Sequence, residues 1–130
     1  MQTYNMLKDK VNWIIHLVYD DIGEGGMMNS HTHGMEQYGQ LDFQVVLPFP
    51  TEHIGYLLNT MGLRVQMGER FKDGDMVKGL YEDCPVRVSE FIEAGRTVLR
   101  LIIPDKHNRF PEDPECDERY KFQINRYFEE

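Results

Sequence analysis

The sequence contains one closely spaced histidine pair, His31 and His33, separated only by Thr32. In a β-strand, residues two apart lie on the same face, so both imidazoles would project from one side of a sheet. Neutral imidazole nitrogens bind Zn²⁺ and other transition metals, usually with a third ligand from elsewhere in the fold. The pair therefore predicts a candidate divalent-metal site. Its third ligand would be one of four, Glu36, His16, His53 or a loop aspartate. The alternative interpretation is an exposed polar face at the edge of a hairpin.

Carboxylates gather in a proline-rich segment that follows Pro104. They are Asp105, Glu112, Asp113, Glu115 and Asp117. Oxygen ligands of this kind suit Ca²⁺, but the segment lacks the glycine and the terminal glutamate spacing of an EF-hand loop. We therefore favour a solvated, rigid loop that packs Phe110 onto the core. Asp105 and Phe110 are candidate binding residues.

The two cysteines, Cys84 and Cys116, are poor candidates for catalytic nucleophiles. A reactive thiolate needs a nearby base and a lowered pKa, whereas the neighbouring carboxylates disfavour the thiolate. The sequence also shows no glycine-rich phosphate loop followed by Lys-Ser or Lys-Thr, and no serine in a nucleophile elbow. No signal peptide is recognisable, so we expect a cytoplasmic protein with reduced thiols.

Length and composition predict one globular domain. The chain has 130 residues, of which 41% are hydrophobic and 28% charged, and a single α+β domain over residues 1–130 is expected. The formal net charge of −8 repels phosphate backbones and anionic lipid headgroups. We therefore expect no nucleic-acid partner and no membrane partner.

Apolar alternation predicts about six strands. They are expected at residues 11–19, 27–35, 41–47, 76–81, 86–92 and 97–103. A helical pattern competes with the strand over the first of these. Short connections favour antiparallel pairing. The prediction is an α+β fold, a mostly antiparallel sheet of about six strands with one main amphipathic helix packed on a face.

The main helix is predicted over residues 52–67, after Thr51 as N-cap and before Gly68 as C-cap. Its apolar stripe consists of Ile54, Leu57, Leu58, Met61 and Val65. Gly55 and Gly62 lie inside it, where glycine disfavours a helix. We interpret them as sites of close packing against a neighbour rather than as a hinge. Short helices are also predicted at residues 3–10 and 120–128.

Several short motifs follow one another in a particular order between residues 11 and 123. They are Asn12-Trp13-Ile14-Ile15-His16-Leu17-Val18, Thr32-His33-Gly34-Met35, Leu58-Asn59, Gly68 to Gly74, Pro104-Asp105 and Phe110-Pro111-Glu112-Asp113-Pro114. This order resembles a bacterial domain-of-unknown-function family, whose His-Pro-Glu segment is replaced here by residues 38–42. Many members carry an aromatic residue and a valine where this chain has His31 and His33. The resemblance implies kinship of fold and no particular activity.

No complete catalytic constellation is visible, so the enzyme status stays open and a non-enzymatic accessory domain is the leading hypothesis. It would bind a protein or small molecule through a face bearing Trp13, His31, His33 and the segment with Asp105 and Phe110. One alternative is a metal-dependent hydrolase-like enzyme using His31 and His33. Another is an immunity or inhibitor protein, since small acidic domains often neutralise basic toxins. No cofactor is identified beyond the candidate divalent metal, and exposed edge strands would allow a homodimer.

Overall fold

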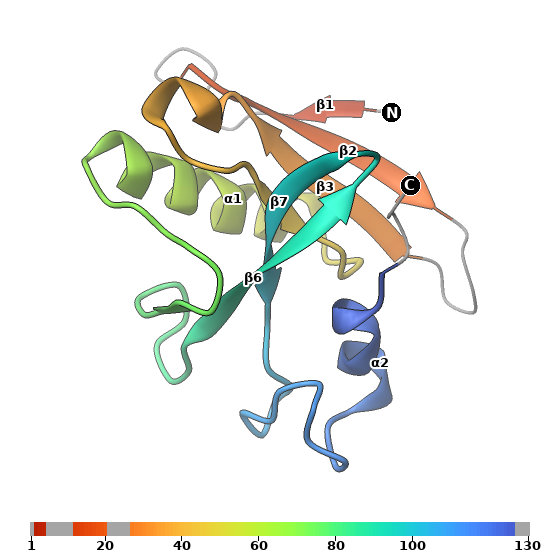
Figure 1. Cartoon of the computed structure of the whole chain (residues 1–130). Helices are drawn as coiled ribbons and strands as arrows, with labels where there is room; N and C mark the ends of the chain where they lie inside the picture. Colours follow the sequence, from red (N-terminus) through yellow and green to blue (C-terminus); the bar gives the residue numbers. More distant parts are fainter. Residues whose placement is uncertain (1, 5–11, 21–26, 127–130) are drawn as a thin grey trace. The chain divides into compact units, whose positions relative to one another are not determined.

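The computed structural model describes residues 2–4, 12–20 and 27–126, which belong to two compact units (Figure 1). Unit 1 runs from Met1 to Phe71 and unit 2 from Lys72 to Glu130. The predicted α+β class is confirmed, because antiparallel strand pairs accompany one main helix. The single domain over residues 1–130 stays a prediction.

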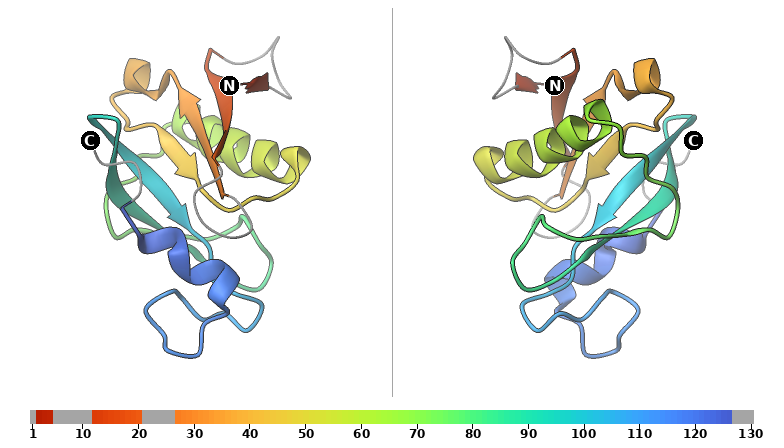
Figure 2. Two further views of the ribbon diagram at one scale, coloured as in Figure 1. Left: turned by 90° about the vertical axis from the view of Figure 1, so that its right-hand side faces the viewer. Right: turned by 90° about the vertical axis from the view of Figure 1, so that its left-hand side faces the viewer.

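Unit 1 is an antiparallel sheet with the strand order β1-β2-β3-β4 and one long helix. Its strands are β1 (Gln2–Tyr4), β2 (Ile14–Asp20), β3 (Met27–His33) and β4 (Phe43–Val45). A 3₁₀ helix, η1 (Met35–Tyr38), connects β3 to β4. The helix α1 (Thr51–Gln66) packs against β3, β4 and η1, and Figure 2 shows it lying across these strands. The short helix predicted at residues 3–10 is wrong at Thr3 and Tyr4, which belong to β1, and its remainder lies outside the described residues.

The apolar stripe predicted for α1 is confirmed, since Ile54, Leu57, Leu58, Met61 and Val65 are all fully buried. The helix begins one residue earlier than expected. Pro50 precedes it as N-cap with φ of −54°, and Thr51 is its first residue. The helix also ends one residue earlier than expected, at Gln66, and its C-cap is Met67 rather than Gly68. Gly68 follows with φ of +115°, a conformation that glycine adopts without the steric cost of a side chain.

Close packing explains Gly62. A Cβ atom there would lie 2.5 Å from two ring carbons of Trp13, whose side chain is buried against the helix. The indole Nε1 of Trp13 donates a 3.0 Å hydrogen bond to Oδ1 of Asn59, one turn earlier on α1. Tyr38 meets the same indole edge-on. The sequence before β2 is therefore fixed to α1 by one aromatic side chain.

Unit 2 contains three antiparallel strands in the order β5-β6-β7, which are β5 (Met76–Val77), β6 (Val86–Glu93) and β7 (Arg96–Ile102). Ala94 and Gly95 join β6 to β7 with φ of +49° and +82°, as in the two-residue turns that suit the twist of a hairpin. Every residue from Val98 to Ile102 is buried, and all of them except Arg100 are apolar. Two short helices follow, α2 (Glu118–Lys121) and η2 (Phe122–Ile124).

The buried Arg100 of β7 is held by the segment that contains η2. Its guanidinium lies 3.7 Å from the ring centroid of Phe91, and Nη1 donates 2.7 Å hydrogen bonds to the carbonyls of Gln123 and Asn125. The Gln123 side chain accepts from the N–H of Ile103 and donates to its carbonyl, both at 2.8 Å. These contacts fix the α2–η2 segment against the end of β7. The same contacts position the loop that connects the end of β7 to the start of α2.

Candidate functional site

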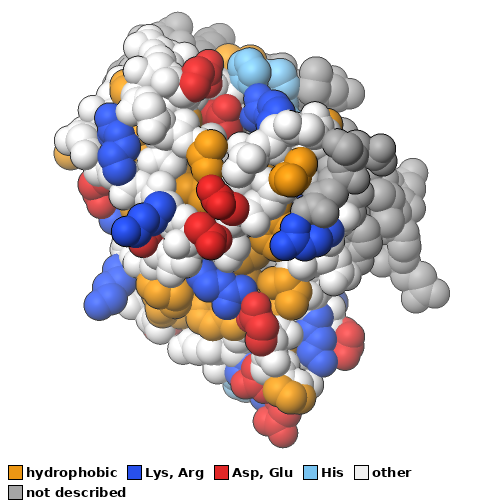
Figure 3. Space-filling view, viewed as in Figure 1, with side chains coloured by type: hydrophobic (Ala, Val, Ile, Leu, Met, Phe, Trp, Pro, Cys, Tyr) orange, Lys and Arg blue, Asp and Glu red, His pale blue; other side chains and the backbone are white. Residues whose placement is uncertain are grey.

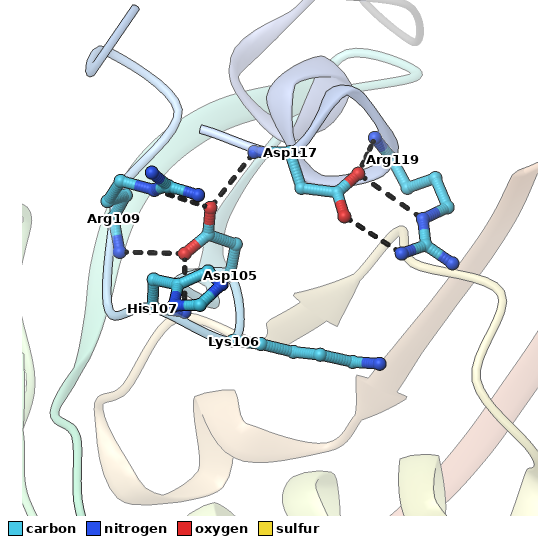
Figure 4. Close-up of a pocket in the computed structure, with 6 residues that line it drawn as sticks. All are labelled: Asp105, Lys106, His107, Arg109, Asp117 and Arg119. Carbon is cyan, nitrogen blue, oxygen red and sulfur yellow. Dashed lines mark hydrogen bonds and ion pairs between the residues drawn. The ribbon is translucent and has the colours of Figure 1, made fainter. Parts of the chain in front are cut away.

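A pocket of about 320 Å³ lies in unit 2, between the loop that follows β7 and the start of α2 (Figure 4). Its lining combines carboxylates with basic side chains. The residues are Asp105, Lys106, His107, Arg109, Asp117 and Arg119. At the lower end of the view in Figure 3, where Figure 1 draws this loop, basic and acidic side chains lie next to one another.

Asp105 organises the pocket. Its carboxylate is buried, and Oδ1 accepts hydrogen bonds from the backbone N–H groups of His107 (2.9 Å) and Arg109 (3.0 Å). Oδ2 accepts from the backbone N–H of Asp117 (2.9 Å) and from Nε of Arg109 (3.1 Å). One carboxylate therefore holds both segments that line the pocket.

The backbone of the loop is shaped around the same residue. The N–H of Asp105 donates to the carbonyl of Arg109, and the N–H of Asn108 donates to the carbonyl of Asp105, both at 2.9 Å. Asn108 has φ of +62°, a left-handed conformation that asparagine tolerates better than most residues. The tight turn presents Lys106 and His107 as exposed side chains at the pocket.

Both carboxylates of the pocket are held in the ionised form. Burial by itself raises the pKa of Asp105. The hydrogen bonds from Arg109, Asp117 and His107 outweigh burial and hold this pKa well below its usual range. Hydrogen bonds from the side chain and the backbone of Arg119 lower the pKa of Asp117 to about 2. Each aspartate therefore carries its charge at neutral pH and pairs with an arginine.

Among the residues that line the pocket the charge balance is positive, although Glu115, outside this lining, also pairs with Arg109 at 3.7 Å. Lys106, Arg109 and Arg119 oppose two aspartates, which leaves one positive charge in excess, whereas the whole chain carries −8. Both arginines are committed to carboxylates: Arg109 to Asp105, and Arg119 to Asp117 through Nη2 at 2.8 Å. No hydrogen bond or ion pair within the described part of the chain engages the Lys106 ammonium, and no dashed line reaches it in Figure 4. This ammonium is the charge that remains for a ligand.

Cys116 belongs to the same loop, one residue before Asp117. It is buried, and its Sγ donates a 3.4 Å hydrogen bond to the carbonyl of Arg109. Burial and the negative charge of Asp105 raise the pKa of Cys116, and burial and Asp83 raise the pKa of Cys84. Because the neutral thiol is a weak nucleophile, these environments favour unreactive cysteines.

Phe110 supports the pocket from the core side. It packs against the buried cluster of Phe91, Val98 and Ile102. The guanidinium of Arg87 lies 5.3 Å from the Phe110 ring centroid and pairs with Glu112 at 2.8 Å. These contacts agree with the interpretation of the acidic segment as a rigid loop that packs Phe110 onto the core.

The predicted site residues are divided between the two units. Trp13, His31 and His33 belong to unit 1, and Asp105 and Phe110 belong to unit 2. Trp13 is 1% exposed, so we do not include it in a ligand-binding surface. No three or more His, Cys, Asp or Glu side chains in the described ranges are arranged to hold a metal ion. The metal site at His31 and His33 stays a prediction.

The basic half of the pocket is missing from the sequence-based prediction. Lys106, His107 and Arg109 follow Asp105, and Arg119 comes after the run of acidic residues that drew attention to the segment. The signal in the sequence was Asp105 itself, because an aspartate commonly accepts hydrogen bonds from backbone N–H groups just after it. Such an aspartate stabilises a turn, and the side chains of Lys106 and His107 in this turn are exposed.

Comparisons with known proteins find no matching family model, no matching curated protein and no matching solved structure. The resemblance to a domain-of-unknown-function family therefore stays a prediction. Among the helices that the structure describes, none combines the length and the apolar character that crossing a membrane requires.

Proposed function

We propose that this chain is a binding module whose unit 2 pocket takes a small molecule through an anionic group, a carboxylate or a phosphate. The observation that carries the proposal is the Lys106 ammonium, which lies at the pocket with no partner among the described residues. An anion at this point would meet one ammonium directly. Arg109 and Arg119 line the same pocket.

The arginines favour binding because they are already oriented. Asp105 fixes Arg109 through Nε, and Asp117 fixes Arg119 through Nε and Nη2. A guanidinium has five N–H donors, so those not used by the aspartates can face a ligand. Groups that are ordered before binding lose less conformational entropy when the ligand arrives.

The same contacts favour binding over acid–base chemistry. A general base works best when its pKa lies near the operating pH, whereas the pKa values of Asp105 and Asp117 lie far below neutrality. Both carboxylates also accept several N–H hydrogen bonds. This supports the accessory binding domain as the leading function. The metal-dependent hydrolase and the immunity or inhibitor protein stay alternative predictions.

Calorimetric titration of the full chain with pyrophosphate and with citrate tests the proposal. We expect saturable binding of at least one of these anions with one site per chain, and we expect Lys106→Ala to weaken it about tenfold, or by about 1.4 kcal/mol. Arg119→Ala should weaken it further, because its side chain is 75% exposed and available to the ligand.

Lys72→Ala is the matched control, because Lys72 is an exposed lysine of unit 2 outside the pocket. It removes the same charge and should leave the affinity unchanged. Equal weakening by Lys72→Ala and Lys106→Ala would show that only the overall charge matters. Absence of saturable binding by both anions would also contradict the proposal.

A further inference from the structure

We infer that the imidazole of His107 makes anion binding at the unit 2 pocket depend on pH, so that the pocket holds an anion more tightly in mildly acidic than in mildly basic solution. The inference rests on the proposed function, because it concerns the same pocket. His107 lines this pocket together with Lys106, and both side chains are exposed on the loop that follows β7 (Figure 4). An anion bound at the Lys106 ammonium would therefore share the pocket with this imidazole.

The position of His107 is fixed through its backbone. Its N–H donates a 2.9 Å hydrogen bond to Oδ1 of the buried Asp105, and the N–H of Arg109 donates to the same oxygen at 3.0 Å. The side chain takes no part in this network. Within the described part of the chain, no hydrogen bond or ion pair engages the His107 imidazole. Its ring nitrogens are therefore available to a ligand.

Charged side chains from two segments lie near His107, the loop itself and the start of α2. They are Asp105, Lys106, Arg109, Glu115, Asp117 and Arg119. Asp83, from the segment before β6, approaches the same turn, because its backbone carbonyl accepts a 3.4 Å hydrogen bond from Nδ2 of Asn108. The charge on the imidazole is therefore felt within a mixed field, whose own response to pH decides whether His107 controls the pocket.

Between pH 5 and pH 8, His107 is the residue of the pocket lining expected to change its charge. Burial raises the pKa of Asp105, but its hydrogen bonds hold this pKa well below the usual range, and the Arg119 side chain lowers the pKa of Asp117 to about 2. Lysine and arginine ordinarily stay protonated throughout this interval, whereas histidine is the side chain that ordinarily changes its charge there. Protonation of His107 would raise the excess of positive charge in the lining from one to two.

Sulfate is the probe that isolates this effect. It keeps two negative charges over the whole interval, whereas a phosphate group changes its own charge near pH 6. The full chain should be titrated with sulfate in a calorimeter at pH 5.5 and at pH 8, at constant ionic strength. We expect an affinity about fivefold higher at pH 5.5, because one positive charge is added close to a dianion.

Linkage provides a second readout, which a merely structural role of His107 would not produce. If the protonated imidazole favours the anion, the anion favours the protonated imidazole by the same factor. The imidazole NMR signals of His107 should therefore titrate at a higher pH in saturating sulfate than in its absence.

Substitution assigns the effect to one histidine. His107→Gln should bring the ratio of the two sulfate affinities to about one, because glutamine carries no charge at either pH. His33→Gln is the matched control. His33 is also exposed, but it belongs to β3 of unit 1 and does not line the pocket, so this variant should keep the pH dependence of the unaltered chain.

Two results would overturn the inference while leaving the anion site in place. One is an equal affinity for sulfate at both pH values, and the other is a His107→Gln variant that responds to pH as strongly as the unaltered chain. Absence of sulfate binding at both pH values would overturn it as well. The pyrophosphate titration would then show whether the proposed function also fails.

Discussion

The backbone N–H of Asp117 donates a 2.9 Å hydrogen bond to Oδ2 of Asp105, twelve residues earlier in the chain. The bond closes the loop between β7 and α2 at the pocket. Because the same carboxylate also binds His107 and Arg109, the shape of the pocket depends on one buried acidic residue.

Asp105→Ala should therefore abolish anion binding and lower the melting temperature. The substitution removes the acceptor of three backbone N–H groups and the partner of Arg109. Thermal unfolding by circular dichroism and titration with pyrophosphate measure the two effects. Asp113→Ala is the milder control, since its Oδ1 accepts one such hydrogen bond, from Glu115. If both variants bound pyrophosphate as the unaltered chain does, Asp105 would not organise the pocket.

Acid should weaken the fold through the two pocket carboxylates. Their pKa values in the folded chain lie below those of an unfolded chain, about 3.9 for aspartate. The stabilisation is therefore complete above that value and is lost as the pH falls through the folded pKa, which is about 2 for Asp117 and still lower for Asp105. The melting temperature of Asp117→Asn should lie below that of the unaltered chain at pH 7 and approach it near pH 2. A difference in melting temperature that stays constant from pH 7 to pH 2 would exclude this linkage.

Gly62→Ala should destabilise unit 1 although alanine favours helices by about 1 kcal/mol. The added methyl group would lie 2.5 Å from the indole carbons of Trp13, and overpacking of this kind costs about 1–3 kcal/mol. Urea unfolding gives the free-energy change. In a double-mutant cycle with Trp13→Phe, which shortens the ring system, the two changes should cost less together than the sum of the separate effects. Strict additivity would argue against the contact.

Gln123→Ala should lower the free energy of unfolding by about 1–3 kcal/mol, because the buried N–H and carbonyl of Ile103 lose their partner. Gln123→Glu is the sharper variant. At neutral pH its carboxylate would face the carbonyl oxygens of Ile103 and Tyr120, which accept from the amide in the unaltered chain. Protonation of the glutamate restores a donor. The loss in free energy of unfolding caused by Gln123→Glu should therefore shrink as the pH falls from 7 to 4. A loss in free energy of unfolding that urea titration finds to be the same at pH 7 and pH 4 would contradict this prediction.

Local sequence patterns predicted the elements of the fold well. The stripe from Ile54 to Val65 lies within one helix, so its period identified α1 and its buried face. The strand expected at residues 97–103 corresponds to β7, in which Arg100 is the only polar residue between Val98 and Ile102, as in a strand that is buried along its length. The strands expected at residues 41–47 and 76–81 are shorter in the structure, β4 and β5 covering three and two residues.

The candidate sites depend on contacts that no local pattern contains. Trp13 lies 46 residues from Asn59 in the chain, so its role in the core could not be distinguished from a binding role. The position of His16 opposite His31 depends on strand register, and a slip of one residue would place His16 on the other face. The pocket depends on the hydrogen bond between Asp105 and Asp117 at the start of α2. The sequence pattern predicted only a loop for this segment.

Mapping the bound anion by NMR tests the central claim most directly. Addition of inorganic phosphate to the ¹⁵N-labelled full chain should shift the backbone signals of residues 105–109 and 117–119 in a saturable way. The Lys106→Ala variant should need a higher phosphate concentration to reach the same shifts. Signals in these segments that stay fixed, or that move no more than those around Lys72, would contradict an anion site in this pocket.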